Sequence, residues 1–183
     1  NLAILAPSCY SELRQMLNYA VLRHSGPIAV RYPKGSETFT LPEGTPEFEL
    51  GKGVILKEGK DITLVAAGKM VPIAMEAAEK VRNLNIDAEV IDVRSIKPLD
   101  INLIISSGMK TGRIITLEDN ILAGGMGNSI LRLLNEKKAN HIKVYLKGFP
   151  DEFIPQGSVS ELFKVYGLDS DSIVKDIIKT VND

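Results

Sequence analysis

The sequence predicts an α/β fold with a mainly parallel sheet flanked by helices, and three observations support this. Segments of strand and helix character alternate along most of the 183 residues. The strand segments are nearly continuous runs of Ile, Val and Leu, which is typical of strands that helices bury on both faces. A strand–helix–strand unit of about 30 residues at the amino end has the size of a parallel crossover.

That amino-terminal unit comprises residues 1–35. The apolar run Leu2–Leu5 predicts a buried strand, and apolar residues at helical spacing predict a helix over residues 11–24, with Ser8 as a candidate helix cap. A second strand over residues 28–32 ends at a proline. Because the chain begins inside a strand whose hydrogen-bonding neighbours must come from elsewhere, we expect it to be a piece of a longer protein, either cut or cloned short.

Residues 36–50 predict a linker. The segment SETFTLPEGTPEFEL contains two prolines, one glycine and four glutamates, and it has no sustained periodicity. Its scattered apolar residues indicate that it lies along a surface.

A second unit comprises residues 51–183. Two apolar runs over residues 54–56 and 62–66 flank EGKD, whose Gly59 suits a tight turn, and together they predict a hairpin. The rest of the unit predicts helices over residues 71–83, 99–109, 127–137, 158–166 and 170–181, and strands over residues 88–93, 113–117 and 141–146.

Composition argues against several classes of partner. The 22 basic and 23 acidic residues give a net charge of −1, so there is no basic excess to neutralise a nucleic-acid backbone. The single cysteine, Cys9, has no partner for an internal disulfide or a cysteine-based metal site, and a reducing, cytoplasmic setting fits best. No apolar run approaches the roughly 20 residues that span a bilayer. We therefore expect neither nucleic acid nor membrane as a partner.

Arg31 is the best single candidate for a binding residue. Ligands of open α/β sheets bind beyond the carboxyl ends of the strands, and Arg31 follows a strand-forming run directly. Its guanidinium offers five donors in a rigid fork that suits a phosphate group. The alternative is an ion pair between Arg31 and a neighbouring helix.

The segment LAGGMGNS resembles a phosphate-cradling loop, because Gly124, Gly125 and Gly127 precede a helix whose amino end could hold an anion. It lacks the Lys-Ser/Thr of a P-loop and the full dinucleotide-binding pattern. The sequence favours the other interpretation, a tight turn that lets helix and sheet pack closely.

Glu118 and Asp119 are adjacent carboxylates. A metal site needs several converging oxygens, and the local sequence offers few, so we expect a solvated loop or an interface ion pair with a residue such as Arg94. His24 and His141 have no motif around them, and we assign neither a catalytic role. The sequence indicates no metal site.

Five segments, in order, resemble the C-terminal third of the 1-deoxy-D-xylulose-5-phosphate synthase family, which are thiamine-diphosphate enzymes of the transketolase type. The segments are GPIAVRYPKG, GKDITLVAAGKMVPIAMEAAEKV, VIDVRSIKPLD, ITLEDNILAGGMGN and GFPDEFIPQGS, the last followed by YGLD. By this resemblance, residues 1–35 are the end of the pyrimidine-binding domain, and residues 51–183 are the C-terminal domain.

The resemblance implies an activity for the full-length protein. The family joins pyruvate and glyceraldehyde 3-phosphate, with loss of carbon dioxide, to give 1-deoxyxylulose 5-phosphate, a precursor of isoprenoids and thiamine. Thiamine diphosphate is the cofactor, held by magnesium, and the enzyme is expected to be a homodimer. Arg31 matches the family arginine that contacts the acceptor's phosphate. Lys34 departs from the family's usual arginine, and we assign it no ligand.

The resemblance also implies what this chain lacks. The segments that bind diphosphate and magnesium, and the catalytic residues, would lie before Asn1. The chain alone is therefore expected to bind no cofactor, to contribute no catalytic residue and to be inactive. Two alternatives stay open: a fragment of a transketolase or of a 2-oxoacid dehydrogenase beta subunit, and a non-catalytic binding or regulatory module of the same fold.

Overall fold

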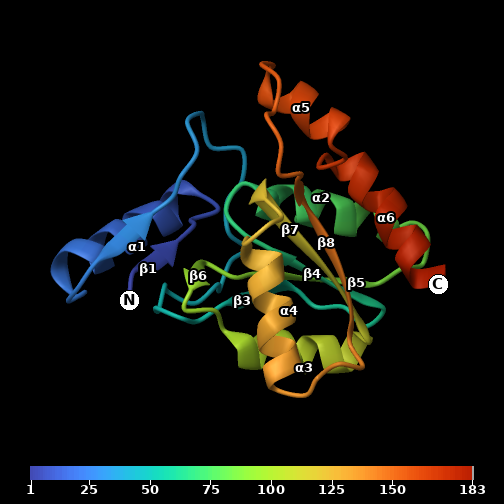
Figure 1. Ribbon diagram of the computed structural model, residues 1–183, viewed down its shortest axis with the longest axis horizontal. Coiled ribbons are helices and arrows are strands. Elements are labelled where there is room, and N and C mark those ends of the chain that lie inside the picture. Colours follow the sequence, from blue (N-terminus) through green and yellow to red (C-terminus); the bar gives the residue numbers. More distant parts are fainter. Residues whose placement is uncertain (183) are drawn as a thin grey trace.

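A small sheet at the amino end contains the predicted crossover. In the computed structural model, which describes residues 1–182, β1 (Ala3–Leu5) and β2 (Ile28–Val30) pair in parallel, and α1 (Tyr10–Leu22) connects them (Figure 1). A third strand, β6 (Ser95–Lys97), pairs antiparallel with β1. β6 could not be predicted from the sequence, because three residues with a lysine and a serine carry no strand pattern. The second unit therefore completes the sheet of the first.

The large sheet is mainly parallel, as predicted. Its five strands lie in the order β3 (Val54–Lys57), β5 (Ala88–Asp92), β4 (Ile62–Ala66), β7 (Arg113–Ile121) and β8 (Lys143–Phe149). Only the edge strand β3 is antiparallel to its neighbour; β5, β4, β7 and β8 run in one direction. The carboxyl ends of β4, β5, β7 and β8 therefore meet at one edge of the sheet.

The predicted hairpin between β3 and β4 is wrong. β5 lies between these two strands, and Gly59 rests against the β5 backbone, where an added Cβ would come within 2.3 Å of the Glu89 nitrogen. All five residues of β4 are buried, whereas β3 is mostly half-exposed. A fully buried strand needs partners on both sides, so β4 pairs with β5 and β7, and β3 takes the edge.

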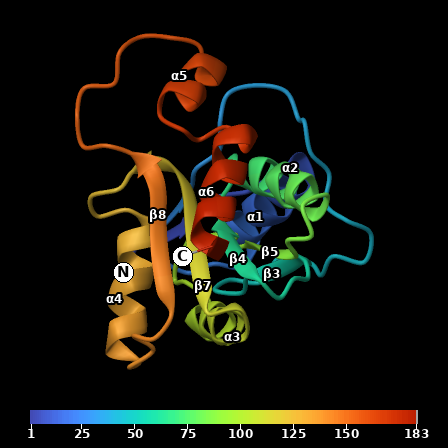
Figure 2. The same ribbon diagram turned by 90° about the vertical axis from the view of Figure 1, so that its right-hand side faces the viewer.

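Helices cover both faces of the large sheet, as the sequence predicts. On one face, α2 (Met70–Arg82) and α6 (Ser170–Asn182) pack with Leu64 and Val90 in a single apolar cluster, which α5 (Val159–Val165) extends. On the other face, α3 (Ile101–Thr111) and α4 (Met126–Glu136) pack with their own cluster (Figure 2). None of the helices within residues 1–182 has the length and apolarity needed to cross a bilayer.

Ser8 does not cap α1 as predicted. Cys9 occupies the capping position and makes no side-chain capping bond. The Ser8 hydroxyl instead donates to a carboxylate oxygen of Glu12 at 2.7 Å, and the Ser8 N–H donates to the same oxygen at 2.9 Å. The reason is that Glu12 is fully buried and needs hydrogen-bond donors.

Residues 36–50 contain no helix or strand and run along the surface between the two units. Phe39 packs against the apolar cluster beneath α2. The N–H of Phe48 donates to the Gln15 side chain of α1 at 2.6 Å.

Candidate functional site

Strand ends from both units meet around Arg31. Arg31 follows β2, Lys69 follows β4, and Asp119 lies near the end of β7. The Arg31 guanidinium donates to the backbone carbonyl of Asp119 and lies 3.8 Å from its carboxylate. The ion pair that the sequence left open for Arg31 therefore exists, but its partner is on a strand and not on a helix. About half of the Arg31 side chain stays exposed, so donors remain available for a ligand.

A hollow of about 70 Å³ lies beside this pair, and six residues line it: Arg31, Tyr32, Pro33, Gly68, Lys69 and Asp119. We call it the Arg31 hollow. Burial raises the pKa of the Asp119 carboxyl, and the positive charges of Arg31 and Lys69 oppose that rise. The hollow thus contains two cations and one carboxylate.

Two larger cavities adjoin the Arg31 hollow. One, of about 590 Å³, shares Arg31 and Asp119 with it and extends to Lys97 and Arg132. The other, of about 550 Å³, shares Lys69 with the Arg31 hollow. Lys34 lines this second cavity and neither the first cavity nor the hollow. Neither His24 nor His141 lines any of these three spaces.

Glu118 and Asp119 do not lie in a solvated loop, so the first of the two sequence expectations is wrong, whereas the second, an interface ion pair, exists between Asp119 and Arg31. They belong to β7, which continues four residues past the predicted end because Ile121 still pairs with Phe149 of β8. The polar run Glu-Asp-Asn hides this extension from a hydrophobicity pattern. Asp119 contacts Arg31, not Arg94, the partner considered from the sequence.

Glu118 occupies the amino end of α4, where the sequence analysis considered the binding of an external anion. Its carboxylate is buried and accepts N–H bonds from Met126 at 2.8 Å and Gly127 at 2.9 Å, at the start of α4. Burial raises the pKa of Glu118, and these two bonds act to lower it. An added Cβ at Gly125 would come within 2.4 Å of the carboxylate, and one at Gly127 within 2.6 Å of the Thr116 hydroxyl. The tight-turn interpretation is therefore confirmed.

Arg94 joins the two units in a buried contact. Its Nε lies 2.6 Å from a carboxylate oxygen of Glu12 on α1, and both side chains are almost wholly buried. The guanidinium also donates to the carbonyl of Pro46 in the linker at 3.0 Å. The sequence analysis considered Arg94 for an interface ion pair, but its partner Glu12 could not be predicted, since 82 residues separate the two. Asp92 accepts the Arg94 backbone N–H at 2.9 Å, and burial and the Glu12 charge raise its pKa.

The sequence model of the transketolase C-terminal domain matches residues 51–173, more than half of the chain. The chain belongs to the transketolase C-terminal domain family. Lys69, Arg94, Glu118 and Asp119 fall inside the matched range, while Arg31 precedes it.

Curated relatives extend the similarity over nearly the whole chain. The 1-deoxy-D-xylulose-5-phosphate synthase of Clostridium tetani is 42% identical over 179 residues, which cover 98% of this chain and 28% of the synthase. The synthase of Heliobacterium modesticaldum is 45% identical over 175 residues, which cover 95% of this chain and 27% of the relative. These relatives confirm the resemblance drawn from the sequence. This transketolase C-terminal domain chain spans little more than a quarter of their length.

Solved structures share the fold. A split-gene transketolase, described as an inactive β4 tetramer, superposes with a TM-score of 0.87 at 32% identity and covers all of this chain and 58% of its own. The transketolase of Campylobacter jejuni superposes with a TM-score of 0.67 at 16% identity, covering 98% of this chain and 26% of its own. At that identity the likeness shows the fold alone.

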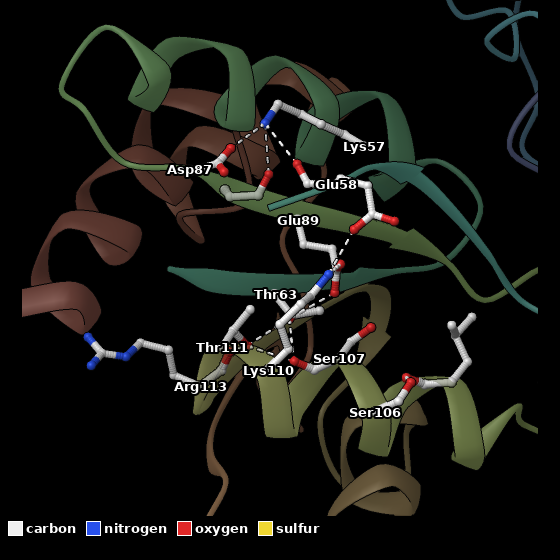
Figure 3. A network of polar contacts seen from close by, with 12 residues as sticks. Lys57, Glu58, Thr63, Asp87, Glu89, Ser106, Ser107, Lys110, Thr111 and Arg113 are labelled. Carbon is white, nitrogen blue, oxygen red and sulfur yellow. Dashed lines mark hydrogen bonds and ion pairs between the residues drawn. The ribbon is translucent and has the colours of Figure 1, made fainter. Parts of the chain in front are cut away.

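Another buried carboxylate of this transketolase C-terminal domain lies at the opposite end of the sheet. Glu89, near the start of β5, is fully buried and pairs with Lys110 of α3 (Figure 3). Lys110 also pairs with Glu58 at 2.8 Å, and the Thr63 hydroxyl donates to Glu89 at 3.3 Å. Ligands of such sheets bind at the carboxyl ends of the strands, whereas this network lies at the amino ends. We therefore assign the network a structural role, which is to hold α3 against β4 and β5.

Proposed function

We propose that the chain is the C-terminal part of a thiamine-diphosphate-dependent synthase that joins pyruvate and glyceraldehyde 3-phosphate with loss of carbon dioxide. The observation that carries the proposal is the 42% identity to the Clostridium tetani synthase over 98% of this chain. The test is carbon dioxide release from pyruvate by the full-length protein. Release that depends on glyceraldehyde 3-phosphate supports the proposal, and pyruvate left unconsumed contradicts it.

Within that reaction, Arg31 binds the phosphate of glyceraldehyde 3-phosphate. It lies at the carboxyl end of a strand, half of its side chain is exposed, and it lines the Arg31 hollow. The contact with Asp119 fixes the guanidinium and so lowers the conformational entropy that binding would cost.

Magnesium and thiamine diphosphate are proposed to be held by parts of the full-length protein outside this chain. Within residues 1–182, no group of three or more His, Cys, Asp or Glu side chains could hold a metal ion. The full-length enzyme is proposed to be a cytoplasmic homodimer, and the chain alone to be inactive.

The isolated chain is expected to bind thiamine diphosphate with no measurable affinity. The reason is the resemblance to the synthase family, which places the segments that bind diphosphate and magnesium outside this chain. Titration calorimetry with cofactor and magnesium measures this directly. Binding with a micromolar dissociation constant would contradict the assignment.

A fragment of a transketolase is the second candidate. The TM-score of 0.87 to the split-gene transketolase, at 32% identity, favours it. The carbon dioxide assay distinguishes the two, because the proposed synthase reaction releases carbon dioxide from pyruvate, whereas ketol transfer by a transketolase releases none.

The division into residues 1–35, 36–50 and 51–183 predicts where a protease cuts first. The first cut is expected within residues 36–45, whose backbone lacks a regular hydrogen-bond ladder. Residues 46–48 are better protected, because Arg94 and Gln15 bind their backbone groups. Mass spectrometry of a timed digest locates the cut, and a first cut inside residues 60–150 would argue against this division.

A further inference from the structure

The charge around Arg31 raises a problem for an anion site. Arg31 carries +1 and Asp119, when ionised, carries −1, so the pair is neutral as a unit. A neutral pair attracts a phosphate dianion only weakly at long range, and the carboxylate repels it at short range. A second cation is needed before the Arg31 hollow becomes net positive.

Lys69 is that second cation. It lines the Arg31 hollow together with Arg31 and Asp119, and its charge acts on the Asp119 carboxyl. Its side chain is half-buried, with the ammonium 5.8 Å from the centre of the Phe163 ring. Within residues 1–182, no carboxylate lies within ion-pair distance of this ammonium. Arg31, Lys69 and Asp119 together carry a net charge of +1.

The place of Lys69 in the fold is a second, independent sign of a ligand. It stands at the amino-terminal cap of α2, where it makes no side-chain capping bond. A cation there opposes the positive end of the helix dipole. The lysine therefore costs local stability, and an anion bound beside it would offset that cost.

We propose that Lys69 is the second phosphate-binding cation of the Arg31 hollow, and that this site takes a phosphate monoester. The inference rests on the function proposed for Arg31. The hollow's volume of about 70 Å³ is that of roughly two liquid waters, at about 30 Å³ each, which suits a single tetrahedral anion. Arg31 supplies the fork of donors, Lys69 supplies the net charge, and the Asp119 carbonyl orients the guanidinium.

The test uses the full-length enzyme with inorganic phosphate as a competitive inhibitor against glyceraldehyde 3-phosphate. Lys69→Met should raise both the inhibition constant of phosphate and the KM for glyceraldehyde 3-phosphate by about tenfold, with the KM for pyruvate unchanged. Lys69→Arg should restore most of the binding. Lys60→Met is the matched control, because Lys60 is exposed and precedes the opposite end of β4.

Two further readouts separate binding from structure. Lys69→Met should leave the Tm unchanged or raise it, since a cation leaves the amino end of a helix. Asp119→Asn should strengthen inhibition by phosphate, because the backbone carbonyl still holds Arg31 while the negative charge is gone.

The outcomes distinguish this inference from the proposed function. If Arg31→Ala weakens binding of glyceraldehyde 3-phosphate and Lys69→Met does not, the role of Lys69 is overturned and the proposed function stands. If neither variant changes that binding, the roles of both Arg31 and Lys69 are overturned, while carbon dioxide release from pyruvate still decides the proposed function. A lower Tm for Lys69→Met with equal losses for both substrates would show that Lys69 is a structural residue.

Discussion

Arg94→Met is expected to lower the free energy of unfolding by about 3–5 kcal/mol. The substitution leaves the Glu12 carboxylate fully buried without its charged partner, and only the Ser8 donors remain. It also removes the hydrogen bond to the Pro46 carbonyl. Urea denaturation of the variant, followed by circular dichroism, measures the loss.

Two controls test this explanation. Arg132→Met breaks an exposed ion pair with Glu136 on α4 and should cost about 1 kcal/mol or less. The double variant Glu12→Leu, Arg94→Met should recover much of the loss, since the buried Glu12 charge is removed together with its partner. A loss below 1 kcal/mol for Arg94→Met alone would mean that water or another donor reaches Glu12.

Arg31→Ala should raise the KM for glyceraldehyde 3-phosphate about ten- to a hundredfold in the full-length enzyme. A charge-assisted hydrogen bond to phosphate contributes about 1.5–3 kcal/mol, and the guanidinium is its donor. The effect on pyruvate should be much smaller, because pyruvate carries no phosphate. Arg31→Lys should recover part of the loss, since a point charge cannot replace the fork. Steady-state kinetics with each substrate varied in turn gives the answer.

Thermal unfolding supplies the control for Arg31. The ion pair with Asp119 is half-exposed on the arginine side, so its removal should cost about 1 kcal/mol or less. Equal losses for both substrates together with a clearly lower Tm would make Arg31 a structural ion-pair residue.

The sequence predicts those features of the fold that local pattern determines. The buried runs around Leu64, Val90 and Ile115 identify central parallel strands, because only strands covered on both faces are apolar throughout. The partner of β3 could not be predicted, since its turn sequence suits a hairpin equally well. Strand pairing is decided by tertiary contacts, and no residue near position 57 indicates that β3 pairs with β5.

The candidate site could likewise be predicted only where local sequence pattern determines it. The rule that ligands lie beyond strand ends identified Arg31 from its place in the sequence. Asp119 and Lys69 could not be assigned to it, because which strand ends meet depends on the sheet order. The pairing of Glu12 with Arg94 was missed for a related reason: each is an ordinary charged residue in its own segment, and only the packing of the two units buries them together.

The pairing of β6 with β1 has a consequence for synthesis on the ribosome. β1 ends at Leu5 and its antiparallel partner begins at Ser95, so the amino-terminal sheet stays incomplete until some 90 further residues have been translated. At about 5–20 residues per second, this wait lasts roughly 5–20 seconds. During that time one side of β1, whose Leu5 is fully buried in the finished protein, presents an unpaired edge. The nascent chain is then most open to binding by a chaperone or to pairing with another copy of itself.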